Sequence, residues 1–140
     1  VSYRSGNTTL MRLSSNGEHA KVFNNILFTS APSGRLAMLD AQGVMALHHN
    51  WLTRGWVDSH SGLTGTITGW ANLEGTSPGF MNMADQNFHP AASSPCRDQA
   101  DAIPSDILPA HDLGLEYVRH ALFQDRPRDG KTDMGAFEWE

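Results

Sequence analysis

The chain has 140 residues, of which 39% are hydrophobic, and a formal net charge of −5. This length suits one domain, or one section of a larger one, and allows a sizeable core. The mild acidity and the lack of a Lys/Arg cluster argue against nucleic acid as a partner. No apolar run approaches the roughly 18 residues of a membrane span. The single cysteine, Cys96, cannot form an internal disulfide.

Related segments recur along the first half of the chain. KVFNNILF (21–28) is followed by MALHHNWL (45–52) and more loosely by TGWANL (68–73), while TLMRL (9–13) and RLAML (35–39) precede the first two. A supersecondary unit repeated every 22 to 25 residues or so, with Gly, Ser and Asn at its corners, is typical of a β-solenoid. The repeat therefore predicts an all-β fold in which short strands stack as parallel coils.

Three asparagines occupy the same place in these segments. Asn25, Asn50 and Asn72 are separated by 25 and 22 residues. Asn tolerates the left-handed conformation of a tight corner, and its amide can bond backbone groups there. Asn side chains on consecutive strands can also bond one another. We expect the three to mark one corner, the alternative being coincidence in an Asn-containing β protein.

Alternation within the strands predicts which side chains face the core. The inner set is Met11, Leu13, Ala37 and Leu39. Arg12 and Met38 alternate with these residues and are therefore expected on the opposite face.

A boundary is expected near residue 75. Residues 51–70 read as a loop bulging from a coil, followed by a strand, and six of the seven prolines lie beyond residue 75. We assign residues 1–75 to parallel β-helix coils and residues 76–140 to a capping segment of the same domain. Within it, residues 112–123 fit a capped helix, but Gly114 and the β-formers favour an extended strand.

The C-terminal segment resembles a known family. The motifs are GFMNMADQNFHPAASSPCRDQA (79–100), YVRH (117–120), DRPRDG (125–130) and DMGAFEWE (133–140). They are similar to the end of bacterial right-handed parallel β-helix proteins of the pectate-lyase-like superfamily. One departure is that Gln99 follows Asp98, where many relatives have Gly, which leaves the turn there undefined.

The resemblance implies a secreted or cell-surface protein of a bacterium that binds or acts on polysaccharide. It implies a polysaccharide lyase or glycosidase whose catalytic centre lies largely outside this chain. A bound calcium ion is suggested only by the resemblance, since no acidic cluster has the density of a calcium site. We otherwise expect no cofactor. The start, VSYRSG, has no initiator Met or leader. We therefore expect upstream coils of the same protein, or self-association through the first coil.

Asp58 and His60 are the candidate catalytic pair. Residues at i and i+2 share a strand face, and a carboxylate can orient an imidazole as a base. A polar loop pair is the simpler alternative. His48 and His49 invite a metal site, but neighbouring strand residues point to opposite faces. Both can therefore ligate one ion only at a corner.

Other residues are candidates for binding or for structure. Trp56, Arg54 and His49 are the candidate substrate-binding residues, with Trp56 exposed in a Gly-flanked loop and Trp51 buried. Near the C-terminus we expect a structural lock. In it Arg126 pairs with Asp133 or Glu138, and Gly135 allows a close backbone approach.

Three functions therefore stay open from the sequence. The chain is part of a carbohydrate-active enzyme, a non-catalytic polysaccharide-binding or surface-display module, or a purely structural cap. The sugar, and whether any bond is cleaved, cannot be read from these residues.

Overall fold

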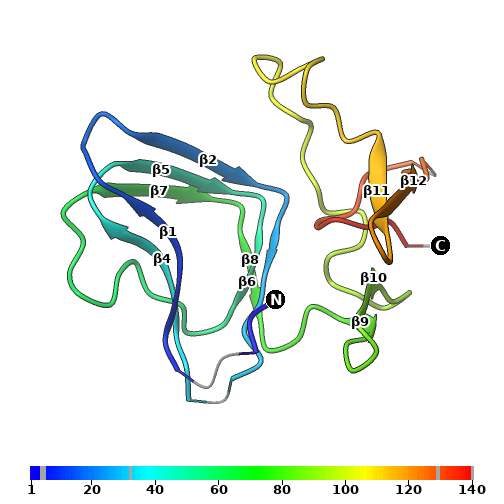
Figure 1. Cartoon of the computed structure of the whole chain (residues 1–140), viewed down its shortest axis with the longest axis horizontal. Coiled ribbons are helices and arrows are strands. Elements are labelled where there is room, and N and C mark those ends of the chain that lie inside the picture. Colours follow the sequence, from blue (N-terminus) through cyan, green and yellow to red (C-terminus); the bar gives the residue numbers. More distant parts are fainter. Residues whose placement is uncertain (4–5, 32, 129, 140) are drawn as a thin grey trace. The chain divides into compact units, whose positions relative to one another are not determined.

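The computed structural model describes residues 1–3, 6–31, 33–128 and 130–139. In this part the chain is all-β, and its twelve short strands form five small sheets (Figure 1). It divides into two compact units, Val1–Ser77 and Pro78–Glu140, which are described separately below. None of the described residues belongs to a helix long and apolar enough to cross a membrane.

The first unit contains eight strands. They are β1 (Thr8–Leu13), β2 (His19–Phe23), β3 (Ile26–Leu27), β4 (Leu36–Ala41), β5 (Val44–His48), β6 (Trp51–Thr53), β7 (Thr66–Trp70) and β8 (Leu73–Gly75). They pair in parallel in three sheets, in the orders β1-β4, β2-β5-β7 and β3-β6-β8. Val22 lies opposite Leu47, and Leu47 lies opposite Gly69. The recurrence in the sequence is thus present as parallel strand pairing.

The predicted right-handed parallel β-helix is nevertheless wrong. No sheet in the described part of the chain has more than three strands, and none closes or continues as a solenoid. The strands are only two to six residues long. Residues 54–65, which are rich in Gly and Ser, form turns and one isolated bridge, Ala37↔Val57, where a further strand would be needed beside β4.

The core of the first unit lies between the sheets. It is formed by Val22, Leu36, Met38, Leu39, Met45, Leu47 and Leu52. The prediction that Met38 faces outward is wrong, because Ala37, Met38 and Leu39 are all fully buried. Since successive strand residues point to opposite faces, both faces of β4 are covered. Trp56, from the turn-rich segment 54–65, packs against this same core.

Each chain corner before β3, β6 and β8 contains one left-handed residue. These are Asn24, His49 and Ala71, with φ angles of 58°, 50° and 51°. Each stands immediately before one of the three recurring asparagines. The interpretation that those asparagines themselves take the left-handed conformation is therefore wrong. Asn24 suits it, whereas Ala71 adopts it against its own preference.

The recurring asparagines form a row of hydrogen bonds, here called the asparagine ladder. Oδ1 of Asn50 accepts the backbone N–H of Asn25 at 3.0 Å, and Oδ1 of Asn72 accepts that of Asn50 at 3.0 Å. Asn50, which is fully buried, also donates from Nδ2 to the carbonyls of Val22 and His48, both at 2.9 Å. The ladder therefore satisfies backbone groups of neighbouring strands at one corner.

The second unit contains four strands in two antiparallel pairs. They are β9 (Phe80–Asn82) with β10 (Asn87–Pro90), and β11 (Leu115–Val118) with β12 (Leu122–Asp125). The extended conformation favoured for part of residues 112–123 is confirmed, and the helix is excluded there. The segment is a hairpin whose loop holds His120 and Ala121 at φ of 74° and 66°.

Replacing Asn50 by Leu tests the ladder. We expect the variant to lose about 3 kcal/mol of unfolding free energy, because the carbonyls of Val22 and His48 lose a buried donor and the N–H of Asn25 loses its acceptor. Asn50→Asp should also be destabilised, since it keeps the acceptor and loses the donors. Asn25→Leu is the matched control. Because Asn25 is exposed, this replacement should lower the unfolding free energy by less. Urea melts with equal midpoints for all four proteins would contradict the ladder's role.

Candidate functional site

A row of three rings lies beside the asparagine ladder. Phe23, His48 and Trp70 are opposite one another in the register of β2, β5 and β7. The Phe23 and His48 rings stack at 5.5 Å, and the His48 and Trp70 rings stack at 4.2 Å with only 3° between their planes. Trp70 is the last ring of the row and is 52% exposed.

Trp70 also borders a cavity of about 340 Å³. The lining residues are Leu47, Trp56, Asp58, Ile67, Gly69, Trp70, Asn72 and Glu74. Trp56 is fixed there, because its Nε1–H donates to Oε1 of Glu74 at 2.7 Å. Asn72 ends the ladder and donates one Nδ2 hydrogen to the Leu47 carbonyl, at 2.8 Å, which leaves a second N–H. The residues that line the cavity thus include two tryptophans, two acidic residues and one asparagine.

The two residues of the predicted catalytic pair make different contacts. Asp58 lines the cavity, whereas Nε2 of His60 lies 3.0 Å from the carbonyl oxygen of Thr8. The imidazole is therefore held by the backbone of β1 instead of by a carboxylate. A carbonyl oxygen only accepts hydrogen bonds, so Nε2 carries the proton in this contact.

The predicted substrate-binding residues are dispersed. Trp56 reaches the cavity but is half-buried, which corrects its expected exposure, while Trp51 is buried as predicted. Arg54 is exposed and is not among the lining residues, and His49 lies at the corner beside His48. Trp70 and Glu74 also line the cavity, and Glu74 was not predicted as a binding residue. The signal for Trp70 was its place opposite His48 in the recurrence.

Within either unit taken alone, the described residues contain no group of three or more His, Cys, Asp or Glu side chains placed to share a metal ion. Cys96 offers no reactive thiol either. Its burial raises the pKa of the thiol to about 12, so the nucleophilic thiolate is scarce at neutral pH.

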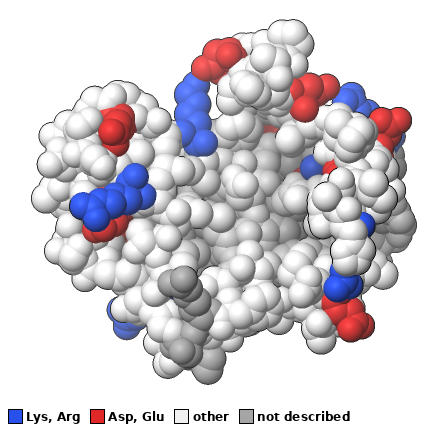
Figure 2. Space-filling model, viewed as in Figure 1, with Lys and Arg blue, Asp and Glu red and all other residues white. Residues whose placement is uncertain are grey.

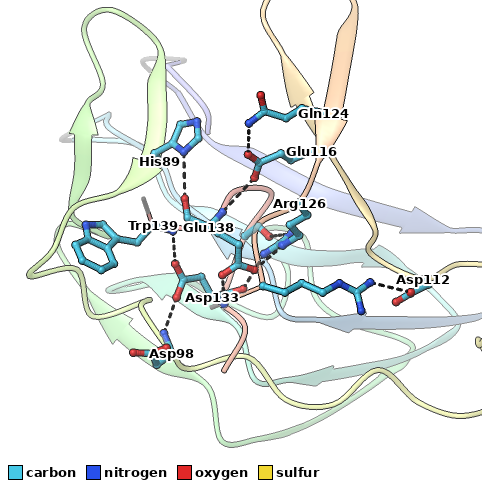
Figure 3. A network of polar contacts seen from close by, with 11 residues as sticks. His89, Asp98, Asp112, Glu116, Gln124, Arg126, Asp133, Glu138 and Trp139 are labelled. Carbon is cyan, nitrogen blue, oxygen red and sulfur yellow. Dashed lines mark hydrogen bonds and ion pairs between the residues drawn. The ribbon is translucent and has the colours of Figure 1, made fainter. Parts of the chain in front are cut away.

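A buried polar network holds the second unit together (Figure 3). Arg126 is at its centre, donating from Nε to Glu138 and from its two terminal nitrogens to the carbonyls of Gly135 and Asp133, each at 3.2 Å. Glu138 in turn accepts the backbone N–H of Asp133, and its own N–H donates to Glu116. The acidic partner of Arg126 is thus Glu138, one of the two expected from the sequence.

Asp133 and Gly135 complete this network. Asp133 accepts the backbone N–H of Asp98 at 2.6 Å and that of Trp139 at 2.7 Å (Figure 3). Gly135 has a φ of 101°, which side chains other than glycine rarely allow. Asp98 itself is left-handed, with φ of 57°, so the turn after Pro95 forms without a glycine at that place.

The network also borders a second cavity, of about 480 Å³. The lining residues are Asp85, Gln86, Asn87, Phe88, His89, Tyr117, Arg119, His120 and Phe137. His89 is fixed there, since its Nδ1 lies 3.1 Å from the Glu138 carbonyl and its ring stacks on Phe137 at 4.5 Å. No sequence pattern predicted this cavity, because its residues come from three separate segments.

Charged side chains are scattered over the face shown in Figure 2. The Lys and Arg side chains lie apart from one another instead of gathering in one patch (Figure 2). One described pair, Arg12 with Asp40, is 4.0 Å apart and largely exposed, so it contributes little to stability. The visible face thus shows no concentrated positive charge.

Replacing Arg126 by Met tests the buried network. We expect a loss of about 3–5 kcal/mol of unfolding free energy, because the buried carboxylate of Glu138 loses its cation and two carbonyls lose their donors. Burial raises the pKa of Glu138, and Arg126 lowers it. Without Arg126, folded Glu138 therefore retains a proton that the unfolded chain releases, and the variant's stability falls as pH rises past the ordinary Glu range. The loss should be smaller near about pH 5 than near about pH 8.

Arg128→Met is the matched control for that experiment. Arg128 pairs with Asp112 at 3.1 Å, but both side chains are at least half exposed. This control should cost less than about 1 kcal/mol at either pH. Equal, pH-independent losses for the two variants in urea melts would show that the buried network is not what holds the second unit together.

Comparisons with known proteins supply no relative. No protein family, no curated protein and no solved structure matches the chain. The resemblance of the C-terminal motifs to pectate-lyase-like proteins therefore remains a prediction. The geometry of the described residues is what supports a function.

Proposed function

We propose that the first unit binds a neutral, hydroxyl-rich saccharide at the cavity beside Trp70. The single observation that carries this is the indole of Trp70, which stacks on His48 while the residue stays 52% exposed. An aromatic face of this kind suits the apolar C–H face of a pyranose ring. The stack also fixes the indole, which reduces the entropy lost when a ligand binds.

The polar groups of the cavity suit the hydroxyls of such a ring. One carboxylate oxygen of Glu74 accepts the indole N–H of Trp56, and the second oxygen can accept a hydrogen bond from a sugar hydroxyl. Asp58 supplies further acceptors, and Asn72 supplies an N–H donor. A few placed polar groups among aromatic walls are typical of small-molecule sites.

The charge of the cavity favours a neutral sugar over an acidic one. Asp58 and Glu74 both line it, and Arg54, the candidate cation of this region, does not. A uronate carboxylate would therefore meet two like charges without a neutralising partner. This argues against the uronate-containing polysaccharides suggested by the family resemblance.

Binding is better supported than cleavage. His60, which was expected to act as a base oriented by Asp58, contacts the Thr8 carbonyl through its Nε2. A module that holds polysaccharide without cleaving it is thus the function that we favour, with bacterial export or surface display following from the resemblance alone.

Trp70→Ala tests the proposed binding. We expect the wild-type chain to bind at least one of cellohexaose, xylohexaose, mannohexaose and laminarihexaose in isothermal titration calorimetry. Trp70→Ala should weaken that binding by about tenfold or more, and Trp70→Phe should keep part of it, because the loss is that of a stacking face. Oligogalacturonate should bind more weakly than the best neutral sugar.

The control for this experiment is Tyr117→Ala. Tyr117 is 54% exposed, close to the value for Trp70, but it lies in the second unit outside this cavity. Affinity should not change in this variant. The proposal fails if none of the four neutral sugars binds, or if Trp70→Ala binds as well as wild type.

A second prediction concerns lyase chemistry. The chain should release no unsaturated product from polygalacturonate or alginate, because His60 is held by a backbone carbonyl and no cation lines the cavity for a uronate. Absorbance in the near ultraviolet measures such a product. Its appearance with wild type and loss with His60→Ala would overturn this expectation.

A further inference from the structure

The adjacent histidines His48 and His49 meet the condition under which neighbours in sequence can hold one metal ion. His48 is the last residue of β5, and His49 follows it at the corner with φ of 50°. The turn brings their side chains to the same side of the chain. Their Nδ1 atoms lie 3.4 Å apart, and the rings are nearly perpendicular, at 86°.

This separation has a specific meaning for a coordination site. Two Zn–N bonds of about 2.0–2.1 Å at the tetrahedral angle place the nitrogens about 3.3–3.4 Å apart. Adjacent ligands of an octahedral ion, at right angles with similar bond lengths, would be about 2.8–3.0 Å apart. The observed distance therefore favours a tetrahedral ion.

We propose that His48 and His49 bind a zinc-like divalent ion through their two Nδ1 atoms. Neutral imidazole is a common ligand of zinc, and the two rings supply two of four tetrahedral positions. The others are open to water or exchangeable ligands. This site is separate from the proposed saccharide function and does not depend on it.

The surroundings prepare both ligands before an ion arrives. The His48 ring is fixed between Phe23 and Trp70, at 5.5 and 4.2 Å, and only 7% of the residue is exposed. His49 occupies a conformation that costs an ordinary residue about 1 kcal/mol or more. Strained residues of this kind persist where the surrounding structure holds them, which here is the corner of the ladder.

The test is titration of the full chain with Zn²⁺ and with Co²⁺. Calorimetry should give one site per chain, and bound Co²⁺ should show the intense visible absorption of tetrahedral coordination. His48→Phe removes the nitrogens and keeps a ring in the stack. His49→Asn removes the imidazole and keeps a residue that tolerates a left-handed φ. Each variant should bind at least about tenfold more weakly, a loss of about 1.4 kcal/mol.

Two further measurements make the result decisive. His60→Asn removes another histidine of the first unit and should leave binding unchanged. Cu²⁺ should quench the indole of Trp70, which stacks on His48, so most of the quenching should be absent in Trp70→Phe. Folding of the variants is checked by urea melts.

The proposal is overturned by either of two outcomes. Zn²⁺ and Co²⁺ could fail to bind the wild-type chain, in which case the nitrogens simply share a hydrogen bond. Alternatively, folded His48→Phe and His49→Asn could bind as tightly as wild type, which would place the metal elsewhere.

Discussion

The buried amide of Asn50 is the interaction on which the first unit depends. It joins the ends of β2 and β5 to the corner before β6. The backbone N–H of Asn50 in turn donates to the side chain of Asn72. Asn72 marks the equivalent corner between β7 and β8. This corner lies between Trp70 and Glu74, which line one cavity. The corner before β6 also turns His49 out of the strand direction. Both proposed sites thus rest on one uncharged amide and its neighbours.

The second unit satisfies its buried polar groups with charged side chains. Its buried groups are a guanidinium and three carboxylates, with Arg126 bonding Glu138 and two carbonyls. Throughout the described residues, every buried side-chain nitrogen or oxygen has a hydrogen-bond partner. An amide row is indifferent to pH, whereas a network with more acids than cations is not. The two units should therefore differ in how acidity affects them.

Local pattern predicted local features of this chain and failed on features that distant segments decide. The recurrence predicted the parallel pairing of strands and the grouping of Asn50 with Asn25 and Asn72. It could do so because strands that pair at a fixed offset leave a repeat in the sequence. It did not foretell how many strands would join, so the extended β-helix was wrong. Met38 was misplaced because alternation assumes one open face. Asp58 and His60 have the i, i+2 spacing of residues on one strand face, but the imidazole of His60 contacts the Thr8 carbonyl of β1.

The asparagine ladder has a direction. Each side-chain N–H points along the row toward the next asparagine, so the Asn25 end offers an oxygen and the Asn72 end offers a hydrogen. A segment that continued the row would have to match that polarity, with a donor at the first end and an acceptor at the last. Two copies meeting symmetrically at Asn25 would set oxygen against oxygen. If the first strands associated, a head-to-tail contact would match donors with acceptors, and such a contact can propagate beyond a pair.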